Sequence, residues 1–340
     1  MWSRWESPTR VICFLSWGTF RMEPSRMSGD NRKKRHLTAV WEDREIRIPL
    51  VELTGVKDGP TLSIVAGVHG SEYPGIEAAI RIVNQIEPNE LRGRLRVVPV
   101  MNIPAFLKRT EAVCPEDGKN PNRAFPGNPE GSYTDIMANL VFEHVVKGSD
   151  AVLNVHGGDI FEALVPYAGM GRSTGGKTDK MCRELGLAYD LPFLVRFAVP
   201  HDSSTGLDLN SAVQASGIPS ILVEAGGNGL LDEKNVQIHL RGFRNCMASL
   251  GMIDCECPRE HKTVECISDF WRIRQTGVFY PSVTLGQRVS LGQDIGVLKD
   301  WFGDEIEIVK AERDAWIIAI VTTPAAVKNA IIYQVAYEQE

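Results

Sequence analysis

The chain contains, at residues 61–72, the sequence TLSIVAGVHGSE, an apolar run that ends in polar residues. A predominantly apolar run of this length is typical of a strand that is buried on both faces of a parallel sheet. Residues 73–86 follow with apolar side chains at helical spacing. The segment therefore predicts a strand–helix unit of an α/β protein, with His69 and Glu72 between the strand and the helix.

Strand and helix patterns continue to alternate on both sides of this unit. Such an alternation predicts a mostly parallel sheet that is flanked by helices. Residues 45–54 alternate apolar and polar side chains and predict a further strand, whereas residues 104–130, rich in Pro, Gly and Asn, predict a long loop. The remaining strands are expected at 94–101, 150–155, 193–199 and 219–223, and the remaining helices at 133–146, 177–187, 209–216 and 235–250.

The pattern changes after Pro258. Short β-like runs separated by glycines follow, without a helical pattern, and predict a small all-β domain over residues 261–340. The α/β domain would then occupy residues 37–260. We expect residues 1–36 to form a disordered N-terminal extension. This segment contains the basic cluster RKKR at 32–35.

The composition is that of an ordinary globular protein. Hydrophobic residues make up 43% of the 340 residues, and 37 Lys+Arg against 43 Asp+Glu give a formal net charge of −6. These values exclude a disordered or fibrous chain and argue against a nucleic-acid partner. The sequence has no apolar run long enough to span a membrane, and its seven cysteines are irregularly spaced. We therefore expect a cytoplasmic protein with a small-molecule partner and no nucleic-acid or membrane partner, and we leave a homo-oligomer open.

Ionisable residues follow three of the predicted buried strands. His69 and Glu72 follow the strand quoted above, and His156 and Glu224 each follow a later one. Because ligands bind at the carboxyl ends of the strands in an open parallel sheet, we expect these four side chains to meet. Two imidazoles and one carboxylate are the ligand set of a catalytic zinc that keeps a fourth position for water. Glu224 would then be the additional carboxylate, a general base.

The predicted long loop supplies two arginines. Arg123 lies between amides and a Pro-Gly pair, and the guanidinium group is the preferred partner of a planar carboxylate. Arg109 lies upstream in the same loop and is a candidate for stabilising an oxyanion.

Four motifs together resemble the succinylglutamate desuccinylase/aspartoacylase family. They are His69-x-x-Glu72, NRAFPG at 122–127, His156 after a strand, and Glu224-x-Gly-Gly. The resemblance covers roughly residues 45–250 and implies a zinc-carboxypeptidase-like fold, in which the part after residue 262 matches a small β-domain.

The resemblance also implies the reaction and the roles of the site residues. The family consists of zinc amidohydrolases, so the expected activity is the zinc-dependent hydrolysis of the amide bond of a small N-acyl amino acid. The resemblance further implies that Asn122 and Arg123 hold a carboxylate of the substrate and that Glu224 acts as base and acid. By the same resemblance Zn²⁺ would be held by His69, Glu72 and His156.

A competing pattern lies at residues 171–178, GRSTGGKT, which match the phosphate-binding P-loop with Lys177 and Thr178 in the phosphate and magnesium positions. A P-loop follows a buried strand, however, whereas residues 162–170 contain Pro166 and no clean apolar run. An NTPase is therefore the weaker alternative.

Three more alternatives stay open. The same glycine-rich stretch holds a G-x-S-x-G pattern around Ser173, which together with Asp202 or Asp208 and His239 would suggest a serine hydrolase. A catalytically inactive, zinc-binding relative and a true carboxypeptidase are the other two. The sequence identifies neither the acyl group nor the amine of the substrate.

Overall fold

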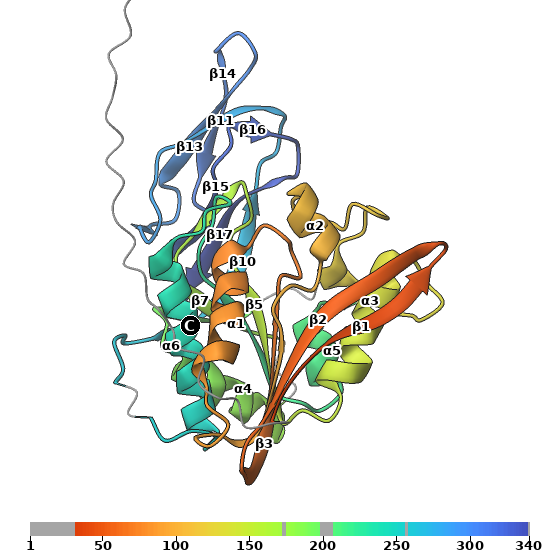
Figure 1. Ribbon diagram of the computed structural model, residues 1–340. Coiled ribbons are helices and arrows are strands. Elements are labelled where there is room, and N and C mark those ends of the chain that lie inside the picture. Colours follow the sequence, from red (N-terminus) through yellow and green to blue (C-terminus); the bar gives the residue numbers. More distant parts are fainter. Residues whose placement is uncertain (1–30, 172–174, 198–206, 256–257, 339–340) are drawn as a thin grey trace, which may run out of the picture. The chain divides into compact units, whose positions relative to one another are not determined.

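The computed structural model describes residues 31–171, 175–197, 207–255 and 258–338 (Figure 1). Four parallel strands form the centre of its largest sheet, in the order β4-β3-β5-β9. Their apolar side chains are almost fully buried, which agrees with the expectation of a parallel sheet covered on both faces. The bounds are β3 Lys57–Ala66, β4 Arg92–Val98, β5 Ala151–His156 and β9 Ser220–Glu224.

The complete sheet is mixed rather than mostly parallel. In the described part of the chain it has thirteen strands, and antiparallel pairs lie on both sides of the parallel centre. Two short strands between β5 and α4 were not expected, β6 (Glu162–Leu164) and β7 (Tyr167–Met170). They lie on either side of Pro166 and are too short to show a pattern in the sequence. β7 runs antiparallel to β9 and parallel to β8 (Phe193–Phe197).

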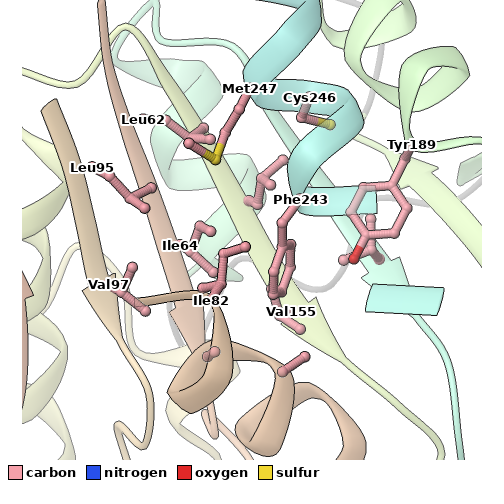
Figure 2. Packing of buried hydrophobic residues seen from close by; sticks show 14 of the residues in the cluster. Leu62, Ile64, Ile82, Leu95, Val97, Val155, Tyr189, Phe243, Cys246 and Met247 are labelled. Atoms are coloured by element: carbon pink, nitrogen blue, oxygen red, sulfur yellow. The ribbon is translucent and has the colours of Figure 1, made fainter. Parts of the chain in front are cut away.

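Helices cover both faces of the parallel centre (Figure 1). The apolar sides of α1, α4 and α6 pack with the sheet in one core cluster, part of which is shown in Figure 2. The sides of α3 and α5 pack in a second cluster on the other face. The helix bounds are α1 Tyr73–Gln85, α3 Tyr133–Val141, α4 Gly176–Tyr189, α5 Leu209–Ala215 and α6 Glu233–Ser249.

The expected loop at 104–130 contains two short helical segments. They are α2 (Ile103–Lys108) and a 3₁₀ turn at Pro121–Arg123. The Asn102 side chain accepts a hydrogen bond from the Ala105 N–H and so caps α2, while the expected helix at 133–146 is α3 followed by a π-helical turn, Phe142–Val146.

The described residues after Pro258 form only strands and loops, as predicted. A four-stranded sheet, in the order β14-β13-β11-β16, is separate from the large one. The strand β10 instead pairs in parallel with β8, so the large sheet continues across the boundary expected near residue 260. The division into domains at that boundary stays a prediction. The bounds are β10 Val264–Arg272, β11 Gly277–Pro281, β12 Arg288–Val289, β13 Asp294–Lys299, β14 Glu305–Lys310, β15 Ala315–Val321, β16 Ala325–Ala326 and β17 Ile331–Tyr337.

The prediction of a disordered extension over residues 1–36 is wrong for residues 32–36. The edge strand β1 (Arg32–Trp41) includes the basic cluster and pairs along its whole length with β2 (Arg44–Thr54). Backbone pairing holds the basic residues in this strand, and two of their side chains add contacts. Arg35 forms an ion pair with Glu52 at 3.0 Å, and Arg32 donates to the Ile86 carbonyl at 2.8 Å. Residues 1–30 lie outside the described part of the chain.

None of the helices in the described ranges is long and apolar enough to cross a membrane.

Candidate active site

The four residues at the strand ends come together as expected. His69 lies in the loop between β3 and α1, and Glu72 is the residue that directly precedes the first turn of α1. His156 and Glu224 are the last residues of β5 and β9, and they are direct neighbours in the register of these parallel strands. The backbone passes closely here, since a Cβ on Gly157 would lie 2.6 Å from the Ala225 carbonyl oxygen.

Two imidazoles face one carboxylate in this cluster. The Nδ1 atom of His69 lies 2.7 Å from Glu72 Oε1, and the Nδ1 atom of His156 lies 2.9 Å from Glu72 Oε2. One ligand atom from each of these three residues lies within 4.8 Å of the other two. The side chains of His156 and Glu72 are almost fully buried, and His69 is partly buried.

The hydrogen bonds around this cluster fit a metal ion. The Asn120 Oδ1 atom accepts from the Asn122 N–H at 2.8 Å and lies 3.2 Å from His69 Nε2. Since an amide oxygen only accepts, Nε2 of His69 carries the proton and Nδ1 keeps its lone pair toward the cluster. Glu72 Oε2 is buried and faces the Nδ1 atom of His156 at 2.9 Å. Imidazole nitrogens and a carboxylate are ligands that Zn²⁺ accepts, so the residues present fit this ion.

Electrostatics keep Glu72 in the form that binds a metal. Burial acts to raise the pKa of its carboxyl, but the adjacent His156 and His69 rings more than offset this and lower it below its usual range. The same carboxylate raises the pKa of His69, against the effect of burial. Glu72 is therefore ionised, as metal ligation requires.

A cavity of about 290 Å³ adjoins the cluster and contains Glu224. Burial, followed by the nearby carboxylates of Glu72 and Glu162, raises the pKa of Glu224 well above its usual range. Its Oε2 atom is buried without a hydrogen-bond partner in the described structure. A carboxyl group with a raised pKa beside candidate metal ligands can take up a proton and return it. The cavity lining comprises His69, Asn122, Arg123, His156, Glu162, Tyr167, Gly171, Phe197, Leu207, Asp208, Asn210, Ser211, Leu222, Glu224, Phe270 and Gln334.

Asn122 and Arg123, the residues predicted to hold a carboxylate of the substrate, both line this cavity. The Asn122 Oδ1 atom accepts from the Leu209 N–H at 3.0 Å, which ties the 3₁₀ turn to the first turn of α5. The amide N–H groups of Asn122 are therefore the part of the side chain that can bind a carboxylate. Arg123 donates from Nη1 to the Asn122 carbonyl at 2.5 Å, and burial lowers the pKa of its guanidinium group.

Arg109, by contrast, is not brought to the cavity. It is exposed, at the C-terminal end of α2, in the left-handed backbone region with φ 55°. A role for Arg109 in stabilising an oxyanion stays a prediction without support from the cavity lining.

The P-loop alternative meets a geometric obstacle. The expectation that no buried strand precedes residue 171 is wrong, because β7 is fully buried. However, the Thr178 hydroxyl donates to the Gly217 carbonyl, near the N-terminal end of β9, whereas Glu224 ends the same strand. Glu224 therefore lies at the other end of β9 from Lys177 and Thr178 and cannot complete a nucleotide site with them. Residues 172–174 lie outside the described part.

His239, the candidate for a serine-hydrolase triad, is fully buried inside α6. Its Nδ1 atom lies 2.8 Å from the Tyr189 hydroxyl and its Nε2 atom 3.2 Å from the Ala225 carbonyl oxygen. Burial lowers the pKa of His239 to about 4, so the ring is neutral. A histidine held in this way by structural groups does not serve a nucleophile. Ser173 and Asp202 lie outside the described residues.

Several residues of the cavity lining were not predicted from the sequence. Gln334 and Phe270 come from strands of the C-terminal region, and Gln334 Oε1 accepts from the Tyr167 hydroxyl at 3.1 Å. Glu162 lies on the unpredicted strand β6, and burial, with Glu72 and Asp159 nearby, raises its pKa to about 7. The Asp-x-x-Glu spacing after His156 was the one local signal for Glu162, whereas nothing local marks Phe270 or Gln334.

Two histidines and a glutamate that can hold one metal ion, with a further carboxyl beside them, are typical of metal-dependent hydrolases. Comparison with known proteins makes the class specific. The model of the succinylglutamate desuccinylase/aspartoacylase catalytic domain matches residues 58–250, more than half of the chain. The chain belongs to this family.

Individual relatives agree with this assignment. The chain is 30% identical over 289 residues to the N-alpha-acetyl-L-2,4-diaminobutyric acid deacetylase of Halomonas elongata, and the match covers 82% of each protein. The fold is similar to that of a succinylglutamate desuccinylase/aspartoacylase from Rhodobacter sphaeroides, with a TM-score of 0.83, 22% identity, and 92% and 97% of the two chains covered. It is also similar to the product-bound ectoine utilization protein EutE (DoeB) from Ruegeria pomeroyi, with a TM-score of 0.81, 23% identity, and 90% and 94% covered.

Proposed function

We propose that this protein hydrolyses the amide bond of a small N-acyl amino acid in a zinc-dependent reaction. The convergence of His69, Glu72 and His156 beside Glu224 is the observation that carries the proposal. The membership of the family supports a hydrolase acting on amide bonds. When bound, Zn²⁺ supplies a Lewis acid that polarises the amide carbonyl and makes water more acidic.

Glu224 carries out the proton transfers. Its carboxylate takes a proton from the attacking water, whose oxygen bonds to the amide carbon. When the C–N bond breaks, Glu224 gives this proton to the departing nitrogen, so that a carboxylic acid and an amine leave. The buried position of Glu224 and its raised pKa suit a group that alternates between the two protonation states.

Arg123 and Asn122 hold the carboxylate of the substrate. The guanidinium group can donate two parallel hydrogen bonds, and the amide of Asn122 adds a third donor on the same turn. This contact is remote from the scissile bond and so fixes the orientation of the substrate without taking part in the proton transfers.

Glu162 favours a substrate that also bears a cationic amine. Its side chain lines the same cavity, and within the described ranges no side chain hydrogen-bonds or ion-pairs with its carboxyl. A carboxyl group facing a cavity in this way is complementary to an ammonium group. The curated relative from Halomonas elongata is named for N-alpha-acetyl-L-2,4-diaminobutyric acid, which carries such a group. We infer a substrate of this type.

The experiment is an activity assay on a panel of N-acyl amino acids, with zinc removed by chelation and then restored. We expect turnover of N-acetyl-2,4-diaminobutyrate that is lost with the chelator and returns with zinc. Activity that the chelator leaves untouched would contradict the metal mechanism. Cleavage of peptides in preference to every N-acyl amino acid would favour the carboxypeptidase alternative, and zinc binding without any turnover would favour the inactive relative.

The remaining expectations stay proposals. A cytoplasmic location, a carboxypeptidase-like relation of the fold, and the absence of nucleic-acid and membrane partners accompany the proposed activity, and a homo-oligomer stays open.

A further inference from the structure

A buried pair, Tyr189 of α4 and His239 of α6, lies behind the active site. Both side chains are 0% exposed, and their polar atoms are 2.8 Å apart. Figure 2 shows Tyr189 beside Phe243 in the core between the helices and the sheet. The proposed proton transfers use neither residue, and a purely apolar pair would fill this part of the core without polar atoms to satisfy.

The hydrogen bonds of this pair have a defined direction. The Ala225 oxygen is a carbonyl and only accepts, so Nε2 of His239, at 3.2 Å from it, must carry a proton. In a neutral ring Nδ1 then has the lone pair, and the Tyr189 hydroxyl donates to it. The result is a chain of two hydrogen bonds that runs from Tyr189 through His239 to the backbone at Ala225.

Ala225 directly follows Glu224, and this chain therefore ends one residue from the proposed base. The Ala225 N–H in turn donates to the His156 carbonyl at 3.3 Å. The helix that follows Glu72 also meets His239, since a Cβ on Gly75 would lie 3.7 Å from His239 Nε2 and 3.9 Å from the His156 oxygen. One imidazole thus hydrogen-bonds to the segment that carries the base and lies close to the helix that follows Glu72.

We propose that Tyr189 and His239 are positioning residues, which fix the peptide after Glu224 and so hold the Glu224 carboxyl in line with the three candidate metal ligands. This role rests on the proposed hydrolase function. Loss of these two hydrogen bonds would loosen the orientation of the base and leave the cavity walls, including Arg123, in place. Since small displacements of a catalytic group reduce the rate of the chemical step, kcat should fall while KM changes little.

The first test is the substitution Tyr189→Phe, which removes one hydroxyl group from the core. Its matched control is Tyr333→Phe, because Tyr333 is equally buried and donates to the Ile295 carbonyl at 2.6 Å, in the core of the C-terminal strands. We expect both variants to lose a similar amount of thermal stability. Only Tyr189→Phe should lower kcat, about three- to ten-fold, with an unchanged KM and zinc content. Equal kcat values in the two variants would overturn the proposal.

The second test compares two substitutions of His239. The Gln side chain in His239→Gln places an N–H donor near the position of Nε2, whereas His239→Leu keeps bulk without a donor. We expect His239→Gln to retain most of the kcat and His239→Leu to lose it, at temperatures where both are folded. Equal kcat values in the two folded variants would contradict a hydrogen-bonded positioning role.

A spectroscopic measurement determines, independently of activity, which group donates in each hydrogen bond of His239. Long-range ¹H–¹⁵N NMR spectra of the zinc-loaded wild type should show His239 as the neutral tautomer protonated at Nε2. The tautomer protonated at Nδ1 would overturn the proposal even if the enzyme is active. A wild type that shows the expected tautomer but turns over no substrate would overturn the proposed function and leave no base to position.

Discussion

The substitution Glu224→Gln removes the proposed base while changing the structure as little as the chain allows. Glu and Gln have the same shape, and Glu224 Oε2 has no hydrogen-bond partner to lose in the described structure. The side chain is buried among other carboxyls, so the neutral amide also relieves charge repulsion. We therefore expect a folded protein with stability and zinc content close to those of the wild type.

The expected effect on the rate is large. General acid–base catalysis contributes roughly 10²- to 10⁴-fold, which corresponds to about 2.7 to 5.5 kcal/mol of transition-state stabilisation. Because Glu224 acts in both proton transfers, we expect the loss in kcat to lie toward the upper end of this range. Substrate binding depends on Arg123 and Asn122, so KM should change by less than about three-fold.

The assay is steady-state release of the amine product from N-acetyl-2,4-diaminobutyrate, with zinc measured on the same samples. Zinc content serves as the control, because a variant that has lost its metal says nothing about the base. A kcat within ten-fold of the wild type, at equal zinc content, would refute Glu224 as the base.

Three further predictions concern the cavity and its support. Arg123→Lys should raise KM about ten-fold or more with a smaller change in kcat, because one of two charged hydrogen bonds, worth about 1.5 kcal/mol, is lost; an unchanged KM contradicts the clamp. Glu162→Gln should raise KM for N-acetyl-2,4-diaminobutyrate but not for N-acetyl-2-aminobutyrate, which lacks the amine; equal effects on both contradict a cation-binding role. Burial lowers the pKa of His239 from 6.5 to about 4, so between these pH values the unfolded chain binds a proton that the folded chain does not. The free energy of unfolding should therefore fall by about 1.4 kcal/mol per pH unit from this group as the pH falls. Unfolding free energies of His239→Gln, measured by urea titration, should depend less steeply on pH; an equal pH dependence in variant and wild type would contradict the lowered pKa of His239.

The strand ends were predictable from the sequence because their signal is local. Predominantly apolar runs end at His69, His156 and Glu224, and the convergence of parallel strands brings these ends together. The role of Asn122 rested on the family resemblance and that of Arg123 also on the chemistry of its guanidinium group, and the structure places both in the cavity wall.

The unpredicted parts depend on contacts between distant segments. Phe270 and Gln334 reach the cavity only because β10 pairs with β8, more than 70 positions apart in sequence, and such pairing leaves no periodic trace. The short strand β7 was not predicted because Pro166 precedes it and its apolar run is short. The basic cluster in β1 resembles a solvated tail in composition, yet backbone pairing with β2 orders it.

The central claim is that His69, Glu72 and His156 hold one zinc ion. X-ray anomalous scattering at the zinc absorption edge, from crystals of the purified wild type, tests this claim most directly. We expect one strong peak bounded by the two Nδ1 atoms and the Glu72 carboxylate, and no such peak at this position in the variant His156→Ala. A zinc-replete wild-type crystal with no peak among these residues, or with its zinc bound elsewhere, would contradict it.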